Sequence, residues 1–169
     1  SGWRNRVRRQ CRSLNNMENI KVLKLNERTP RLIEQICSVW EKSVRATHKF
    51  LSYGEIDEIS KYVPEAVKNV PSLIVAEKDG IITAFMGIDK NKLEMLFISP
   101  CEIGKGLGKK LLLYGINNYS VNELCVNEQN PNAIAFYNKM GFSVYKRSGT
   151  DEQGMPYPIL YMRLKQHHI

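Results

Sequence analysis

The dipeptide Asp79-Gly80 separates two apolar runs and restricts the fold of this chain more than any other feature. A two-residue hairpin turn of type I′ needs positive φ at both central positions, and Asp-Gly tolerates that conformation. The flanking runs, Ser72 to Glu77 and Ile81 to Ile88, are therefore predicted to be antiparallel strands. A turn at Asp89 to Asn91 and a further apolar run, Leu93 to Ile98, extend the pair to a meander.

Helical and extended patterns lie on both sides of this meander. Thr29-Pro30 is typical of a capped helix start, and apolar residues follow at helical spacing as far as Thr47 or His48. A second short helix is predicted from Glu55 to Lys68, with an interruption at Pro64. The remaining elements are strands at Asn19 to Leu25, Val121 to Val126, Phe142 to Tyr145 and Ile159 to Leu164, and helices through Leu111 to Ile116 and from Asn130-Pro131 to Gly141. Together they predict a mixed α/β sheet with helices on both faces.

Length and charge place these elements in one domain with a basic segment before it. The 169 residues suit a single domain, and 43% hydrophobic with 25% charged residues is ordinary globular composition. The net charge of +8 includes five arginines within Ser1 to Asn16, a segment without acids, and falls to +3 without them. We expect residues 1–16 to be a tail, a remnant of expression or an upstream extension, and residues 17–169 to form the domain. An arm that binds RNA is the alternative, but Trp3 is its only stacking aromatic, so no nucleic-acid partner is predicted.

The sequence also argues against membrane and metal partners. No apolar run approaches the ~18 residues of a membrane span, and the N-terminus lacks the apolar stretch of a signal peptide, so a cytoplasmic protein is expected. His167 and His168 are adjacent at the C-terminus, where a metal role is improbable. The cysteines form no Cys-x-x-Cys motif and are expected to be reduced thiols: Cys11, Cys37, Cys101 and Cys125. No metal site is predicted.

A glycine-rich loop, Ile103 to Gly108, follows the third strand of the meander and precedes a helix. Its amides would point away from the positive end of that helix, an arrangement that binds phosphate. Lys105, Lys109 and Lys110 add positive potential around the loop. The loop does not fit the P-loop, which needs four residues between its glycines, or the dinucleotide fingerprint, whose last glycine would come one residue later.

Two stretches of the chain resemble the signatures of the GCN5-related N-acetyltransferase (GNAT) family. The first runs from Leu96 through the glycine loop to Leu112, and the second from Val126 to Phe142, with the family's asparagine-initiated helix and closing Gly-Phe. The resemblance covers most of Asn19 to Leu164. It implies a largely antiparallel mixed sheet of six or seven strands flanked by helices on both faces. Because dimers are common among similar proteins, it also suggests a homodimer.

The resemblance implies acetyl-CoA as the cosubstrate. In the family, loop amides hold the pyrophosphate, and the strand before the loop offers main-chain hydrogen bonds to the pantetheine and the acetyl carbonyl. Ile103 stands where the family usually has Arg or Gln, a departure expected to weaken binding. The implied cofactor-binding residues are Leu96, Phe97, Ile98, Ile103, Gly104, Lys105, Gly106, Leu107, Gly108, Lys109, Asn130 and Tyr137.

Tyr137 is the implied catalytic residue, at the position from which the family protonates the departing thiolate. The departing thiolate belongs to a thiol of pKa about 8.5, and a nearby phenol of pKa about 10 can hydrogen-bond to it and protonate it. The alternative is that Tyr137 only packs, because it belongs to a helical stripe with Ala133, Phe136 and Met140. The surrounding signature favours catalysis. Cys125 stands where several family members carry a glutamate base, which leaves a water chain or an amine that arrives unprotonated as alternatives.

The acceptor pocket is expected between Trp40 to Leu51 and Asp151 to Pro158, two stretches that resemble a subgroup of small bacterial acetyltransferases. Arg45 is suited to hold a carboxylate or phosphate of the substrate, or it pairs with Glu41. His48 is suited to relay a proton, or it caps its helix. Tyr157, between two prolines, is either a pocket wall or a plug at a strand edge.

These inferences predict an N-acetyltransferase. It would transfer acetyl from acetyl-CoA to a primary amine of a small-molecule or peptide acceptor, by direct attack within a ternary complex. The alternative is a CoA-binding sensor or interaction module that has lost catalysis, suggested by Ile103 and the missing glutamate.

Overall fold

The computed structural model describes residues 18–166. The predicted tail at residues 1–16, Cys11 and the terminal histidines His167 and His168 lie outside these described residues. Within them, no helix has both the length and the apolar character needed to cross a membrane.

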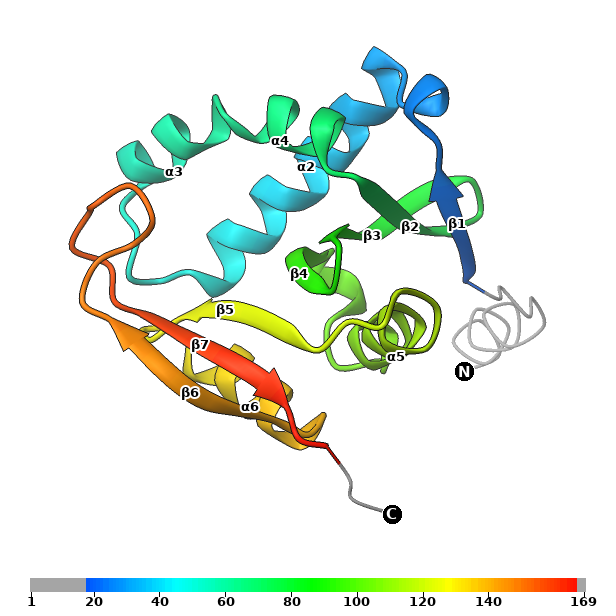
Figure 1. Cartoon of the computed structure of the whole chain (residues 1–169). Coiled ribbons are helices and arrows are strands. Elements are labelled where there is room, and N and C mark those ends of the chain that lie inside the picture. The colour runs from blue at the N-terminus through cyan, green and yellow to red at the C-terminus, as the bar shows by residue number, and fades with distance from the viewer. Residues whose placement is uncertain (1–17, 167–169) are drawn as a thin grey trace, which may run out of the picture.

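One seven-stranded sheet runs through the described domain, with strand order β1-β2-β3-β4-β5-β7-β6 (Figure 1). Neighbouring strands pair antiparallel except β4 and β5, which are parallel. The strands are β1 (Asn19–Leu23), β2 (Ser72–Lys78), β3 (Ile81–Asp89), β4 (Lys92–Ile98), β5 (Glu123–Asn127), β6 (Phe142–Ser148) and β7 (Ile159–Leu164). The largely antiparallel mixed sheet is therefore confirmed, with seven strands.

Within residues 18–166, five α-helices cover the two faces of the sheet, which confirms the predicted layers. They are α2 (Pro30–Thr47), α3 (Tyr53–Ser60), α4 (Val63–Asn69), α5 (Leu107–Tyr119) and α6 (Pro131–Lys139). Two short 3₁₀ turns, η1 (Leu25–Glu27) and η2 (Pro100–Glu102), complete the order. The helices α2, α3 and α4 bury one apolar cluster against β2, β3 and β4, whereas α5 and α6 bury a second on the other face.

Local chemistry explains most of the element boundaries. The Thr29 side chain accepts a hydrogen bond from the Leu32 N–H at the start of α2, and Asp79 and Gly80 have φ values of 54° and 74° in the β2–β3 turn. The interruption predicted at Pro64, within the helix from Glu55 to Lys68, occurs earlier, because α3 ends at Ser60 and α4 begins at Val63. Pro64 lies in the first turn of α4, where a missing N–H costs nothing, so the break precedes it.

The sheet opens beside β4. Strands β4 and β5 pair only where Lys92 and Leu93 face Glu123 and Leu124, and they separate beyond that point. On the other edge of β4, Leu93 pairs with Ile88 and Met95 pairs with Gly87, so Glu94 is the extra residue of a β-bulge. The bulge and the opening lie at the same position along β4.

Candidate active site

A groove of about 510 Å³ runs along the glycine loop and the start of α6. It is lined by ten of the residues that the sequence assigned to the cofactor: Leu96, Phe97, Ile98, Ile103, Gly104, Gly106, Gly108, Lys109, Asn130 and Tyr137. The side chains of Lys105 and Leu107 lie elsewhere, since Lys105 pairs with Glu102 at 3.7 Å and Leu107 is buried in the core. Lys139 adds a second cation beside Lys109.

The glycine loop has the backbone of an anion cradle. Gly104 and Gly106 have φ values of 81° and 84°, in the left-handed region that favours glycine. Gly106 is the N-cap of α5 and supplies no side-chain cap, so the N–H groups of the first turn of α5 remain available to a ligand. Gly108 packs closely instead, because a Cβ there would approach the Ile98 Cδ1 to 2.9 Å.

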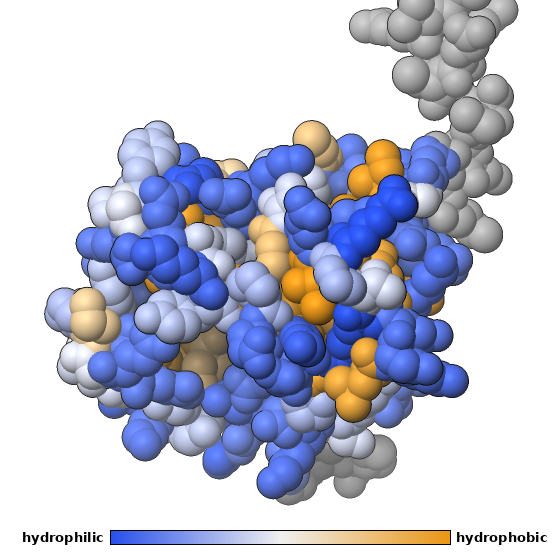
Figure 2. Space-filling model, turned by 90° about the horizontal axis from the view of Figure 1, so that it is seen from above, coloured by the Kyte–Doolittle hydropathy of each residue, from blue (hydrophilic) through white to orange (hydrophobic). Residues whose placement is uncertain are grey.

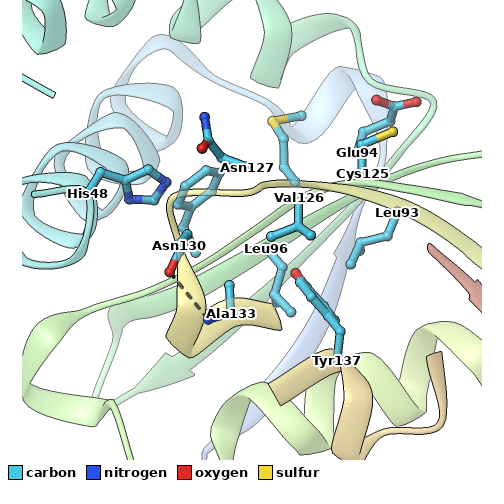
Figure 3. Close-up of a pocket in the computed structure, with 12 residues that line it drawn as sticks. His48, Leu93, Glu94, Leu96, Cys125, Val126, Asn127, Asn130, Ala133 and Tyr137 are labelled. Atoms are coloured by element: carbon cyan, nitrogen blue, oxygen red, sulfur yellow. Dashed lines mark hydrogen bonds between the residues drawn. The ribbon is translucent and has the colours of Figure 1, made fainter. Parts of the chain in front are cut away.

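The groove continues into a smaller cavity of about 140 Å³ between the separating ends of β4 and β5 (Figure 3). We call this space the splay cavity. It shares six lining residues with the groove: His48, Leu96, Phe97, Asn130, Ala133 and Tyr137. Asn130 also caps α6, where its side-chain oxygen accepts a hydrogen bond from the Ala133 N–H at 3.3 Å.

Tyr137 is both a core residue and part of the cavity wall. Its ring centroid lies 5.2 Å from that of Phe136 and 6.2 Å from that of Phe142, and the residue is 9% exposed. In Figure 3 its phenol oxygen points into the splay cavity. Burial raises the pKa of Tyr137, so the phenol keeps its proton and can act as a donor.

On its other side the splay cavity joins a wide cleft of about 970 Å³, which we call the acidic cleft. The two spaces share Leu93, Glu94 and Cys125. The carboxylates of the cleft outnumber its one lining cation, Lys92. They are Glu55, Glu58, Glu94, Asp151 and Glu152. The surface around α3 and α4, seen from above in Figure 2, is mostly hydrophilic, with apolar residues recessed between.

Comparisons with known proteins agree with this geometry. The family model for the acetyltransferase (GNAT) domain matches residues 39–164. The chain belongs to the GNAT acetyltransferase family. Peptidyl-lysine N-acetyltransferase YjaB of Salmonella typhimurium is 35% identical over 127 residues, which cover 75% of this chain and 88% of that protein.

Solved structures confirm the GNAT fold. The solution structure of apo YjaB from Escherichia coli aligns with a TM-score of 0.77 and 32% identity, covering 89% of this chain and 99% of that one. A PaiA N-acetyltransferase from Thermoplasma acidophilum in complex with coenzyme A aligns with a TM-score of 0.64 and 24% identity, over 88% and 99% of the two chains. The predicted family, fold and enzyme class are confirmed: the protein is a GNAT-type N-acetyltransferase.

The predicted acceptor residues of this GNAT enzyme occupy different places. Arg45 lies outside the groove, the splay cavity and the acidic cleft, and its guanidinium donates to Glu41 at 2.9 Å and to Asp57 at 2.6 Å. The ion pair with Glu41, the structural alternative, is therefore present. Tyr157 lines the acidic cleft, where a hydrogen bond with Glu55 raises its pKa. His48 lines the groove and the splay cavity.

Two further groups of the GNAT site bear on its chemistry. Cys125 lines the splay cavity and the acidic cleft, and burial raises its pKa against the opposing effect of Lys92, so a neutral thiol is favoured. Sequence reasoning missed Glu94, although an acid within the apolar run from Leu93 to Ile98 was a signal. Among residues 18–166, no three or more His, Cys, Asp and Glu side chains form a group that could hold a metal ion.

Proposed function

We propose that this enzyme transfers the acetyl group of acetyl-CoA to the side-chain amine of a lysine in a peptide or protein. Attack is direct, within a ternary complex. The observation that carries the proposal is the continuity of three spaces: the splay cavity shares lining residues with the groove at one end and with the acidic cleft at the other. A donor in the groove and an acceptor in the cleft therefore meet in one small cavity.

The groove fits the cosubstrate. Gly104 and Gly106 expose loop amides beside the start of α5, and Lys109 and Lys139 supply the positive potential that a pyrophosphate needs. Among the described residues, the β4 edge that faces β5 has no strand partner beyond Leu93, so its main-chain groups can bond an amide-containing arm. When bound there, acetyl-CoA supplies an activated acetyl group. Tyr137 holds the proton that the departing sulfur takes.

The acidic cleft fits a cationic acceptor. Its carboxylates create a negative potential that concentrates ammonium groups. Apolar side chains, among them Ile59, Tyr62 and Met155, offer contacts to the four methylenes of a lysine. The name of the YjaB relative supports the same acceptor class, because that protein is a peptidyl-lysine N-acetyltransferase.

The test combines binding with acetylation. Calorimetric titration with acetyl-CoA should give micromolar affinity, and thiol release should depend on a peptide whose single lysine is its only free amine. Mass spectrometry should locate the acetyl group on that lysine, and a matched peptide with arginine in its place is the control. Binding without release to any peptide or polyamine would favour the alternative of a sensor, and absence of binding would overturn the proposal.

The charge of the cleft adds a selectivity that can be measured. We expect peptides with arginines on both sides of the lysine to react with a higher kcat/KM than peptides with glutamates there, by about tenfold or more at low salt. The difference should shrink as salt is added, because ions screen exposed charges. Equal rates for the two peptides would show that the cleft does not receive the residues next to the lysine.

A further inference from the structure

An imidazole stands where the groove meets the splay cavity. His48 is the C-cap residue of α2 and lines both spaces. Its ring centroid lies 5.4 Å from that of Phe50 and 6.4 Å from that of Phe97. In Figure 3 the ring extends from the end of α2 into the cavity, toward which Tyr137 points from α6.

A short chain of hydrogen bonds fixes which nitrogen of this ring carries the proton. Thr47 Oγ1 lies 2.8 Å from the carbonyl oxygen of Ser43 and 2.8 Å from Nδ1 of His48. A carbonyl only accepts, so the single hydroxyl hydrogen of Thr47 goes to Ser43. Thr47 Oγ1 can then only accept from the ring, and Nδ1 of His48 must carry hydrogen. In the neutral imidazole, Nε2 is left with a free lone pair.

The surroundings favour the neutral ring. Burial lowers the pKa of His48 below its ordinary value of about 6.5. The cations that line the same groove are Lys109 and Lys139. The other titratable groups that border the splay cavity with His48 are Glu94, Cys125 and Tyr137.

We infer that His48 Nε2 is the proton acceptor for the attacking amine, an assignment that rests on the proposed function. The splay cavity, at about 140 Å³, has room for roughly five waters of about 30 Å³ each. His48 and Tyr137 both line this one cavity, so an amine bound in it can reach either of them directly or through intervening water. Oε1 of Glu94 lies 3.7 Å from Nζ of Lys92. Glu94 also lines the acidic cleft, where its carboxylate can hold the incoming ammonium group.

The protons of the proposed reaction are all accounted for by the lysine amine, His48 and Tyr137. The lysine ammonium first loses one proton to solvent. The nitrogen lone pair then forms the bond to the acetyl carbon, and the carbon–sulfur bond breaks with its electron pair on sulfur. One proton passes from nitrogen to His48 Nε2, directly or through one water, while Tyr137 gives its hydroxyl proton to sulfur. The imidazolium and the phenolate border the same cavity, so a proton transferred through its water restores both.

The first experiment determines the tautomer of the His48 imidazole without a ligand. The full chain contains three histidines, so the ¹⁵N spectrum of the His48→Gln variant identifies the signals of His48. We expect the Nδ1–H tautomer in the wild type at pH 7.5. Thr47→Ser should keep it, whereas Thr47→Val, which cannot accept the hydrogen bond, should shift the ring toward the Nε2–H form. An Nε2–H tautomer in the wild type would overturn the inference.

The second experiment is a pH–rate profile with the lysine peptide, alongside calorimetric binding of acetyl-CoA. In the wild type, kcat/KM should fall more steeply once the pH drops below the pKa of His48, which burial places below the ordinary value of about 6.5. His48→Gln should lower kcat at pH 7.5 by about 100-fold and remove this fall, with acetyl-CoA binding retained.

The outcomes separate this inference from the proposed function. A wild type that neither binds acetyl-CoA nor acetylates the peptide contradicts the proposed function. An active wild type together with a His48→Gln variant of unchanged rate and profile refutes only the role of His48. If Glu94→Gln removes the fall at low pH while His48→Gln keeps it, the carboxylate is the base and the inference is wrong.

Discussion

Replacing Tyr137 with phenylalanine should separate catalysis from stability. The variant keeps the ring and its contacts with Phe136 and Phe142, and within the described part of the chain the phenol oxygen makes no hydrogen bond to another residue. The free energy of unfolding should therefore change by no more than about 0.5 kcal/mol. The lost proton donor should lower kcat by about 100- to 10,000-fold, or roughly 3–5 kcal/mol in the barrier.

Single-turnover rates, urea titration and acetyl-CoA calorimetry on one preparation measure these quantities together. Burial raises the pKa of Tyr137, so the phenol keeps its proton at alkaline pH. Deprotonation of Tyr137 should therefore not lower the wild-type kcat at any pH up to about 10. Tyr145→Phe is the matched control, since Tyr145 lies on β6 at 45% exposure and lines none of the described cavities.

Two results would refute the reasoning. If chemistry is rate-limiting and Tyr137→Phe keeps the wild-type kcat, then another group or water protonates the sulfur. If the variant instead loses several kcal/mol of stability, the phenol oxygen has a structural role, and the loss of activity could no longer be ascribed to proton donation.

Three further variants test the stability of the fold and the binding of acetyl-CoA. Arg28→Met removes a buried guanidinium that donates to carbonyls at the end of α4, among them that of Val67, and should cost about 3–5 kcal/mol in urea unfolding. Gly106→Ala places a side chain at a φ of 84° and should weaken acetyl-CoA binding by about tenfold in calorimetry, whereas Gly80→Ala, at 74° in the hairpin, should leave it unchanged. Ile103→Arg should strengthen that binding several-fold, with an effect that decreases in salt.

Features that depend on a few neighbouring residues could be predicted from the sequence. The hairpin at Asp79-Gly80, the start of α2 at Thr29-Pro30 and the glycine loop before α5 all follow from local backbone preferences. The break between α3 and α4 was misplaced because Pro64 is tolerated in a first helical turn and does not itself interrupt a helix. Local signals therefore located the elements better than their ends.

The acceptor side depends on tertiary contacts and could not be predicted in the same way. The carboxylates of the acidic cleft come from α3, from β4 and from the loop before β7, segments that no sequence spacing relates. The bulge at Glu94 depends on its pairing with β3, so the residue resembles an ordinary outward position of an apolar strand. Arg45 was considered as a substrate ligand, but α3 brings Asp57 to its guanidinium.

The short parallel pairing of β4 and β5 provides the opening at which the two proposed substrates would meet. Tyr137 belongs to the face of the sheet covered by α5 and α6, whereas the acidic cleft lies beside α3 on the other face. If β4 and β5 were paired along their whole length, the sheet would separate a donor on one face from an acceptor on the other, and the main-chain groups of β4 would be satisfied within the protein. Because pairing stops at Leu93, the proposed proton donor Tyr137, the open edge of β4 and His48 all border one opening. We therefore expect replacements of the residues that line this gap in the sheet to alter the rate most.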